Sequence, residues 1–169
     1  QIWGSMSDRV GRRPVIIVSI IISAASYLVF AHATSLLLLF VSRILTGIGS
    51  GNIAAAQAYV SDITKPQDRA KRIGLVVGAS FGLAFAFGPA IGGSIYSHFG
   101  LEMLGYVATG LCAVNLIGVL IALPESLLVM DPTRPINFKP IASTFASLRD
   151  NRFRDIFIIG FVYITAFSM

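Results

Sequence analysis

The sequence predicts an all-α integral membrane protein. Apolar residues make up 55% of the 169 residues and charged residues 12%, whereas a soluble domain carries about 25% charged residues. The charges also avoid long stretches of the chain: no Asp, Glu, Lys or Arg occurs in the 29 residues between Arg13 and Arg43. A helix needs about 20 apolar residues to cross a bilayer, so such stretches predict membrane-spanning helices.

The first part of the chain predicts the end of one helix and two complete spans. Residues 1–6 continue into a charged turn, and Pro14 suits the first turn of the next helix because the missing N–H has no helical partner there. The predicted spans are residues 15–31 and 36–59. The polar residues 32–35 separate them.

The middle of the chain predicts two more complete spans. A second charged turn covers residues 62–72, and residues 64–67 have the spacing of a capping box, which predicts that the next helix begins there. The uncharged residues 73–101 form one span with a break at 97–100. Residues 103–124 form the following span.

The last part of the chain predicts a linker and the start of another span. Residues 125–155 are rich in Pro, Asp, Asn, Arg and Lys, which favours a loop, with a short surface helix around Phe145 as an alternative. The apolar residues 156–169 are too short to cross a bilayer. We therefore expect the sequence to be a piece of a longer chain.

Basic residues predict the topology. Twelve of the 13 Lys and Arg residues fall in three clusters, and the intervening loops at residues 32–35 and 98–102 hold none. Because cytoplasmic loops are enriched in Lys and Arg, we expect residues 8–13, 65–72 and 125–155 to face the cytoplasm, at a plasma or bacterial inner membrane. The same clustering explains the net charge of +5 without nucleic acid.

Several classes of function have no support in the sequence. It contains no Ser/His/Asp or Cys/His arrangement, no phosphate-binding motif and no metal-ligand spacing, and Cys112 is the single cysteine. The glycines at 47, 49 and 51 are not a dinucleotide loop, because they lie inside a predicted span. We expect no enzyme, no catalytic residue, no metal and no cofactor.

Arg43 is the only charged residue inside a predicted span. At 1.5 Å per residue it lies roughly 12 Å from the start of its helix, where a charge costs about 2.5–3.5 kcal/mol to insert. We expect it to face the interior of the bundle and to find a partner. The alternative is that its long side chain extends to the headgroups.

Small residues recur every four positions in two predicted spans. Glycines and alanines fall on one face at positions 47, 51 and 55 and at positions 74, 78, 82 and 86. Such stripes allow helices to approach closely, so we expect packing seams there. The polar residues Asn52 and Gln57 predict interhelical hydrogen bonds or contacts with a substrate.

Three motifs resemble those of the major facilitator superfamily. The first turn matches G-x-x-x-D-R-x-G-R-R at Gly4, Asp8, Arg9, Gly11, Arg12 and Arg13. The next full span is similar to the helix-four motif at Leu39, Arg43, Thr46, Gly47 and Gly49, with Thr46 where glutamine is usual. The antiporter motif of helix five is matched at Gly88, Pro89, Gly92 and Gly93, with Ala84 in place of an upstream glycine. Residues 58–64 and 123–126 resemble the tetracycline-resistance and multidrug-efflux branch.

The resemblance implies a partial major facilitator fold. Of an expected twelve helices, the chain would supply the end of helix two, helices three to six, a central loop and the start of helix seven. The implied domains are residues 1–123 of the N-terminal half, a cytoplasmic loop at 124–152, and the start of the C-terminal half at 153–169.

The resemblance also implies a function. It favours proton-coupled efflux of drug-like, amphipathic small molecules by a protein that is monomeric when complete. Proton-coupled uptake of a sugar or organic acid, and a non-transporting membrane scaffold or receptor, stay open as alternatives. The resemblance assigns Arg12 to a charge link with Asp62 at the cytoplasmic gate, and it assigns Arg43, Thr46 and Gly47 to proton coupling or the cavity.

Overall fold

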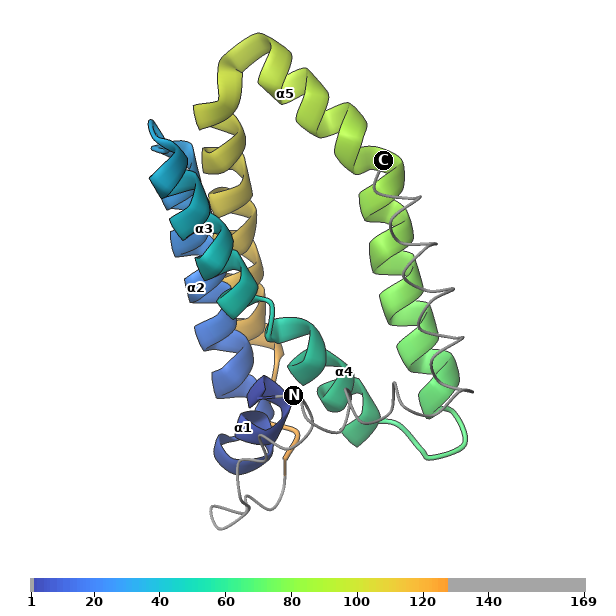
Figure 1. Ribbon diagram of the computed structural model, residues 1–169. Helices are drawn as coiled ribbons and strands as arrows, with labels where there is room; N and C mark the ends of the chain where they lie inside the picture. The colour runs from blue at the N-terminus through green and yellow to red at the C-terminus, as the bar shows by residue number, and fades with distance from the viewer. Residues whose placement is uncertain (1, 128–169) are drawn as a thin grey trace, which may run out of the picture. The chain divides into compact units, whose positions relative to one another are not determined.

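The structure is a computed structural model that describes residues 2–127 (Figure 1). In this part of the chain all regular structure is helical, and its bounds are α1 Ile2–Val10, α2 Arg12–Ala31, α3 Leu36–Gly49, α4 Asn52–Asp62 and α5 Arg69–Ala122. The predicted linker beyond residue 127 and the predicted span at 156–169 lie outside the described residues. The all-α prediction is confirmed for the described part.

Two predicted boundaries of α2 are confirmed. Gly11 has a φ of 108°, a conformation that side chains disfavour, and it separates α1 from α2. Pro14 lies in the first turn of α2, as predicted. At the other end, the break at residues 32–35 is present, and the Ser35 hydroxyl accepts a hydrogen bond from the Leu38 amide, which caps α3.

The single span predicted for residues 36–59 is wrong in one respect, because the helix is divided at Ser50 and Gly51. These residues have ψ angles of −4° and −19°, and the Ile53 amide bonds to the Ser50 carbonyl three residues back, as in a tight turn. The continuous stretch of residues 36–62 is still long and apolar enough to cross a membrane.

The capping box predicted at residues 64–67 does not form. Thr64 ends the turn that follows α4, since its amide bonds to the Ser61 carbonyl, and its hydroxyl has no hydrogen-bond partner in the structure. The Thr64 side chain therefore does not cap the start of α5. α5 therefore starts later, at Arg69.

α5 contains two spans rather than one. Its 54 residues would extend about 80 Å as a straight helix, more than twice the thickness of a bilayer core. At Gly100 the backbone leaves the helical conformation, with φ 80° and ψ −177°, and the chain turns back (Figure 1). The predicted break at residues 97–100 is confirmed, and α5 divides into residues 69–99 and 101–122.

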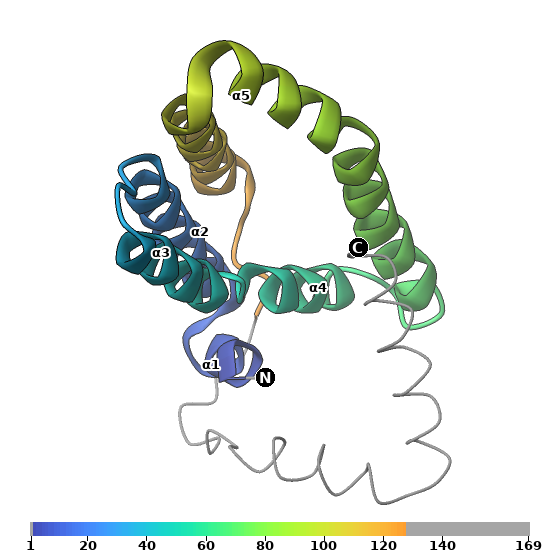
Figure 2. The ribbon, with the colours of Figure 1, turned by 45° about the horizontal axis from the view of Figure 1, so that its top comes forward.

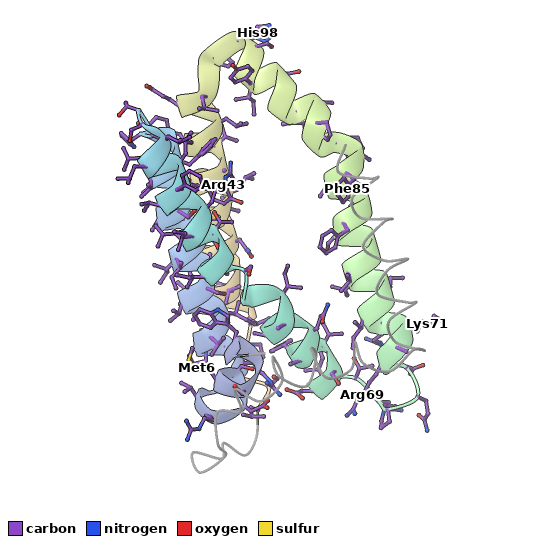
Figure 3. The ribbon with its side chains drawn as sticks, viewed as in Figure 1. Met6, Arg43, Arg69, Lys71, Phe85 and His98 are labelled. Carbon is purple, nitrogen blue, oxygen red and sulfur yellow. The ribbon has the colours of Figure 1, made fainter. Side chains whose placement is uncertain are left out.

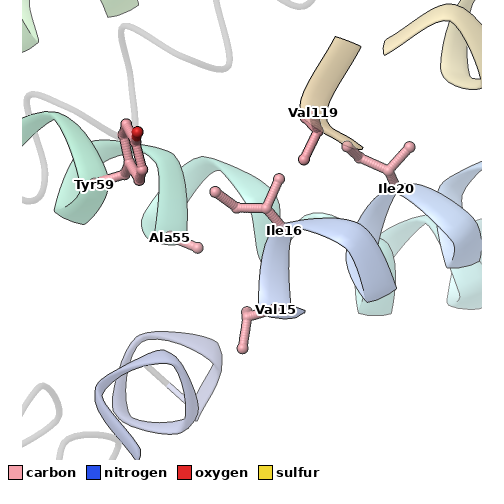
Figure 4. Packing of buried hydrophobic residues seen from close by; sticks show 6 residues of the cluster. All are labelled: Val15, Ile16, Ile20, Ala55, Tyr59 and Val119. Atoms are coloured by element: carbon pink, nitrogen blue, oxygen red, sulfur yellow. The ribbon is translucent and has the colours of Figure 1, made fainter. Parts of the chain in front are cut away.

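α2 is the centre of the described bundle. It packs against α3, α4 and the second part of α5. α2, α4 and the second part of α5 share one buried apolar core. It consists of Val15, Ile16, Ile20, Ala55, Tyr59 and Val119 (Figure 4). Met6, Arg69 and Lys71 lie towards one end of this bundle and His98 at the other, which agrees with basic turns on one side (Figure 3).

Among the glycines of the predicted seams, only Gly51 meets a close neighbour, because an added Cβ there would overlap the Trp3 ring of α1. A further close approach, which was not predicted, is at Gly105. A side chain at Gly105 would overlap Ala31 of α2, and the Tyr106 hydroxyl lies 3.1 Å from the His32 ring, so these helices are held together at this end. By contrast, an added Cβ at Gly47, Gly74, Gly78 or Gly82 would meet no described atom within 4 Å. The predicted seams at these four positions have no partner among residues 2–127.

Candidate functional site

Arg12 forms the centre of a charge cluster, which we define as Asp8, Arg12 and Asp62. Its guanidinium contacts Asp8 one turn back along the chain, and its Nε lies 3.0 Å from the Asp62 carboxylate of α4. It also donates a hydrogen bond to the Ser7 hydroxyl. Arg12 is only 8% exposed. The link to Asp62 implied by the resemblance is therefore present in the structure.

Glu125 binds the start of α2 from the far end of the described chain. Its two carboxylate oxygens accept hydrogen bonds from the backbone amides of Arg12, at 2.9 Å, and Arg13, at 3.1 Å. It also accepts bonds from the amides of Ser126 and Leu127 at 3.0 and 3.1 Å. A carboxylate at the positive end of a helix is favourable, so Glu125 caps α2.

The hydrogen bonds of Glu125 outweigh its burial. Partial burial alone would raise the pKa of this carboxyl, but four backbone N–H donors stabilise its charged form and bring the pKa below the ordinary value of a glutamate. The group is therefore a carboxylate at neutral pH.

This role of Glu125 was not predicted from the sequence. One signal was available: Gly11, which precedes α2, has no side chain, so a side-chain cap of this helix could come only from another part of the chain.

Two further contacts join the same region. The Ser126 hydroxyl lies 3.3 Å from the Asp62 carboxylate, and the Arg13 guanidinium donates a 2.8 Å hydrogen bond to the Leu120 carbonyl. The end of α1, the start of α2, the end of α4 and residues 120–126 thus meet at one place. Of the other motif residues, Arg9 is half-buried, and Gly4 has no atom within 4 Å of an added Cβ.

Arg43 is exposed among the described residues, and its place facing the bundle interior stays a prediction. Ser42 and Gly49 occupy the face of α3 that is buried against α2, and Arg43, one residue on from Ser42, is rotated away from that face. Its guanidinium carbon lies 5.0 Å from the centre of the Phe30 ring, close enough for a cation–π contact. Figure 3 shows Arg43 on α3, well away from the turns at its two ends.

A cavity of about 190 Å³ adjoins Arg43. Its lining includes Tyr27, Phe30 and Thr46, together with the small residues Gly105 and Ala108, and no acidic side chain of the described chain lines it. Thr46 lies 2.6 Å from the Ser26 hydroxyl and so forms part of the α2–α3 contact. The cavity combines a cation with aromatic rings.

Two other hollows lie between the described helices. Gln57 lines one of about 140 Å³ between α4 and the first part of α5. A larger one of about 590 Å³ lies among α2, α4 and α5 and is mostly apolar, with Ser80 and Asn115 among its few polar residues. Asn52 is the first residue of α4.

The antiporter-motif residues lie on the first part of α5. Pro89 is inside the helix, and the φ and ψ angles of α5 depart from helical values only at Gly100. An added Cβ at Gly92 would lie 3.9 Å from Leu104, while Gly88 and Gly93 have open space. The described chain does not bring these four residues to the charge cluster.

Comparison with known proteins agrees with these motifs. Residues 1–169 match the sequence profile of the Major Facilitator Superfamily. Tetracycline resistance protein, class B, of Escherichia coli is 43% identical over 90 residues, which cover 53% of this chain and 22% of that protein. Multidrug resistance protein 2 of Bacillus subtilis is 30% identical over 169 residues, covering 98% of this chain and 42% of that protein.

A solved structure is also similar. The crystal structure of the human organic anion transporter MFSD10 (TETRAN) matches with a TM-score of 0.72 and 33% identity, over 83% of this chain and 32% of that one. The chain thus spans between about a fifth and two fifths of the length of these relatives. The matched profile, the relatives and the helical structure together show that this chain belongs to the major facilitator superfamily and contains part of its fold.

Proposed function

We propose that the complete protein is a secondary transporter that exports drug-like, amphipathic small molecules in exchange for protons by alternating access. The similarity to tetracycline and multidrug resistance proteins supports export. The mostly apolar 590 Å³ hollow with few polar groups has the character of a drug-binding site. No cofactor is needed for this function, and we propose that the complete protein acts as a monomer.

The charge cluster is the observation that supports transport by alternating access. It joins the turn between two spans to the end of a third through two partly exposed carboxylates and one buried arginine. Partly exposed ion pairs contribute about 0–1 kcal/mol each, too little to hold the fold but enough to bias two nearly balanced states. We propose that this cluster latches the cytoplasmic side closed, with residues 8–13, 65–72 and 125–155 facing the cytoplasm.

Arg43 is the proposed site of proton coupling. Its place within a span and beside a cavity supports this role, together with Thr46 and Gly47 of the same motif. A second candidate role for Arg43 is direct binding of an anionic substrate. No acidic side chain of the described chain lines the 190 Å³ cavity beside it, and the chain is similar to an organic anion transporter. Gly88, Pro89, Gly92 and Gly93 are proposed to act as the antiporter motif.

Transport by the full-length protein in inverted membrane vesicles tests these roles. A cationic dye and an organic anion serve as probes, and an acidic interior should drive accumulation that a protonophore abolishes. Arg43→Ala should abolish proton-driven accumulation but leave exchange of the dye at equal concentrations intact, because exchange needs no proton. Arg12→Ala should slow accumulation several-fold and keep it proton-dependent.

The alternatives give different results. If the wild-type protein exchanges the anion but not the dye, and Arg43→Ala then loses anion exchange, this pair of results would assign Arg43 to binding an anionic substrate. Accumulation that is insensitive to the proton gradient would overturn antiport, and no movement of any probe would favour the scaffold or receptor.

A further inference from the structure

The span of residues 36–62 carries its two charged residues on separate helical pieces. Arg43 lies on α3 and Asp62 on α4, and the turn at Ser50 and Gly51 comes between them. Figures 1 and 2 show that α4 leaves this turn in a different direction from α3. The division allows the half with Asp62 to move while the half with Arg43 stays in place.

α3 is fixed to α2 by directional contacts. The Ser26 hydroxyl donates a 2.7 Å hydrogen bond to the Ser42 carbonyl and lies 2.6 Å from the Thr46 hydroxyl, and both serines are 1% exposed. At Gly49 the backbones are so close that an added Cβ would stand 3.1 Å from the Ser23 nitrogen. Sliding or rotating α3 on α2 would break buried hydrogen bonds, which is costly.

α4 is held to α2 in a different way. Ala55 and Tyr59 share one buried apolar cluster with Ile16 of α2 (Figure 4), and the ion pair of Asp62 lies at the end of α4. Apolar contacts have no preferred direction, so they tolerate a change of angle better than a buried hydrogen bond does. The ion pair is thus the main directional contact of α4 with α2.

Trp3 of α1 occupies the turn between the two pieces. A side-chain carbon added at Gly51 would overlap three atoms of the indole ring, so the ring lies directly on this glycine. The same short helix carries Ser7 and Asp8, which bind Arg12. α1 therefore contacts both the turn at the start of α4 and the arginine that binds the end of α4.

We propose that Ser50 and Gly51 form a hinge and that Trp3 is a positioning residue, which holds α4 at the angle where Asp62 reaches Arg12. When the charge cluster opens, α4 turns about this hinge while α2 and α3 keep their contacts. The proposal rests on the latch role of the charge cluster proposed above, and it adds the moving element and the residue that sets its closed position.

Distances between spin labels in the full-length protein test the hinge, without substrate or proton gradient. Labels at Val18 and Ile63 report α4 relative to α2, and labels at Val18 and Phe40 report α3 relative to α2; all three side chains are exposed. Gly51→Ala should shift the Val18–Ile63 distance beyond the wild-type distribution and leave Val18–Phe40 unchanged. Gly47→Ala is the matched control, since its added methyl meets no described atom within 4 Å.

Relief of the overlap provides the second test. Replacing the indole as well, in the Trp3→Ala, Gly51→Ala double variant, should return the Val18–Ile63 distance towards wild type, and Trp3→Phe alone should keep it. If Gly51→Ala fails to fold, Trp3→Ala alone should broaden the same distance. Parallel movement of both distances, or no change in either, would overturn the hinge. Absence of transport by the wild-type protein, with the distances changing as expected, would overturn only the proposed function.

Discussion

The buried guanidinium of Arg12 is compensated by two carboxylates, those of Asp8 and Asp62. One of them, Asp8, lies only four residues earlier, but Gly11 separates the two helices that carry Asp8 and Arg12, so this pair meets across the turn. The other, Asp62, is 50 residues away, and its pairing came only from the resemblance. Charge spacing within a helix can be read from a sequence, but pairing between helices depends on how they pack.

Glu125 gives a prediction at the same scale. Glu125→Gln removes the charge and one of two accepting oxygens, so the cap of α2 should weaken by about 1 kcal/mol. We expect a lower midpoint in thermal unfolding of the purified full-length protein at pH 7. Glu102→Gln is the reference, because Glu102 is an exposed acid in the first turn of the second part of α5 and reports what an exposed carboxylate at a helix start contributes; Glu125→Gln should cost more.

The pH dependence of this difference has a fixed sign. Because folding lowers the pKa of Glu125, its stabilisation is present in full above the unfolded pKa of about 4.3 and is lost as pH falls through the folded pKa. The gap between wild type and Glu125→Gln should therefore be constant from pH 8 to about pH 5 and close below about pH 4. A gap that grows on acidification would contradict the role of the charged form.

At the scale of elements, a break marked by polar residues or by a glycine at the end of a span was easier to predict than one among the glycines of a span. Breaks at residues 32–35 and 97–100 were predicted because polar residues or Gly100 interrupt apolar sequence. The turn at Ser50 and Gly51 was missed because glycines in a span also serve close packing, and a single sequence does not separate these uses. The capping box does not form because the Thr64 amide bonds back to Ser61, and residues 65–68 form a turn of their own before α5 begins.

Gly100 provides the prediction for an element. Its φ of 80° with ψ of −177° is a conformation that essentially only glycine adopts, and an added Cβ there meets no described atom within 4 Å. Gly100→Ala should therefore destabilise the protein by about 1–3 kcal/mol through backbone strain alone. Thermal unfolding should show this loss, and Gly93→Ala, equally open but helical, should show none.

At the scale of the whole molecule, the topology can be tested directly. In a full-length variant without Cys112, single cysteines at Ser35 and His98 should react with an impermeant thiol reagent added outside intact cells, and one at Lys65 should not. The reason is that basic residues concentrate in alternate turns. Reaction of the Lys65 cysteine from outside would reverse the arrangement.

The cap of α2 also has a consequence for biosynthesis. Glu125 lies 113 residues after the amide of Arg12 that it binds. During synthesis α2 leaves the ribosome long before its cap exists, and contacts so distant in sequence form late. The charged turn at the start of α2 can reach its final form only after residues 101–122 have been made, so its completion marks the assembly of the helices in between.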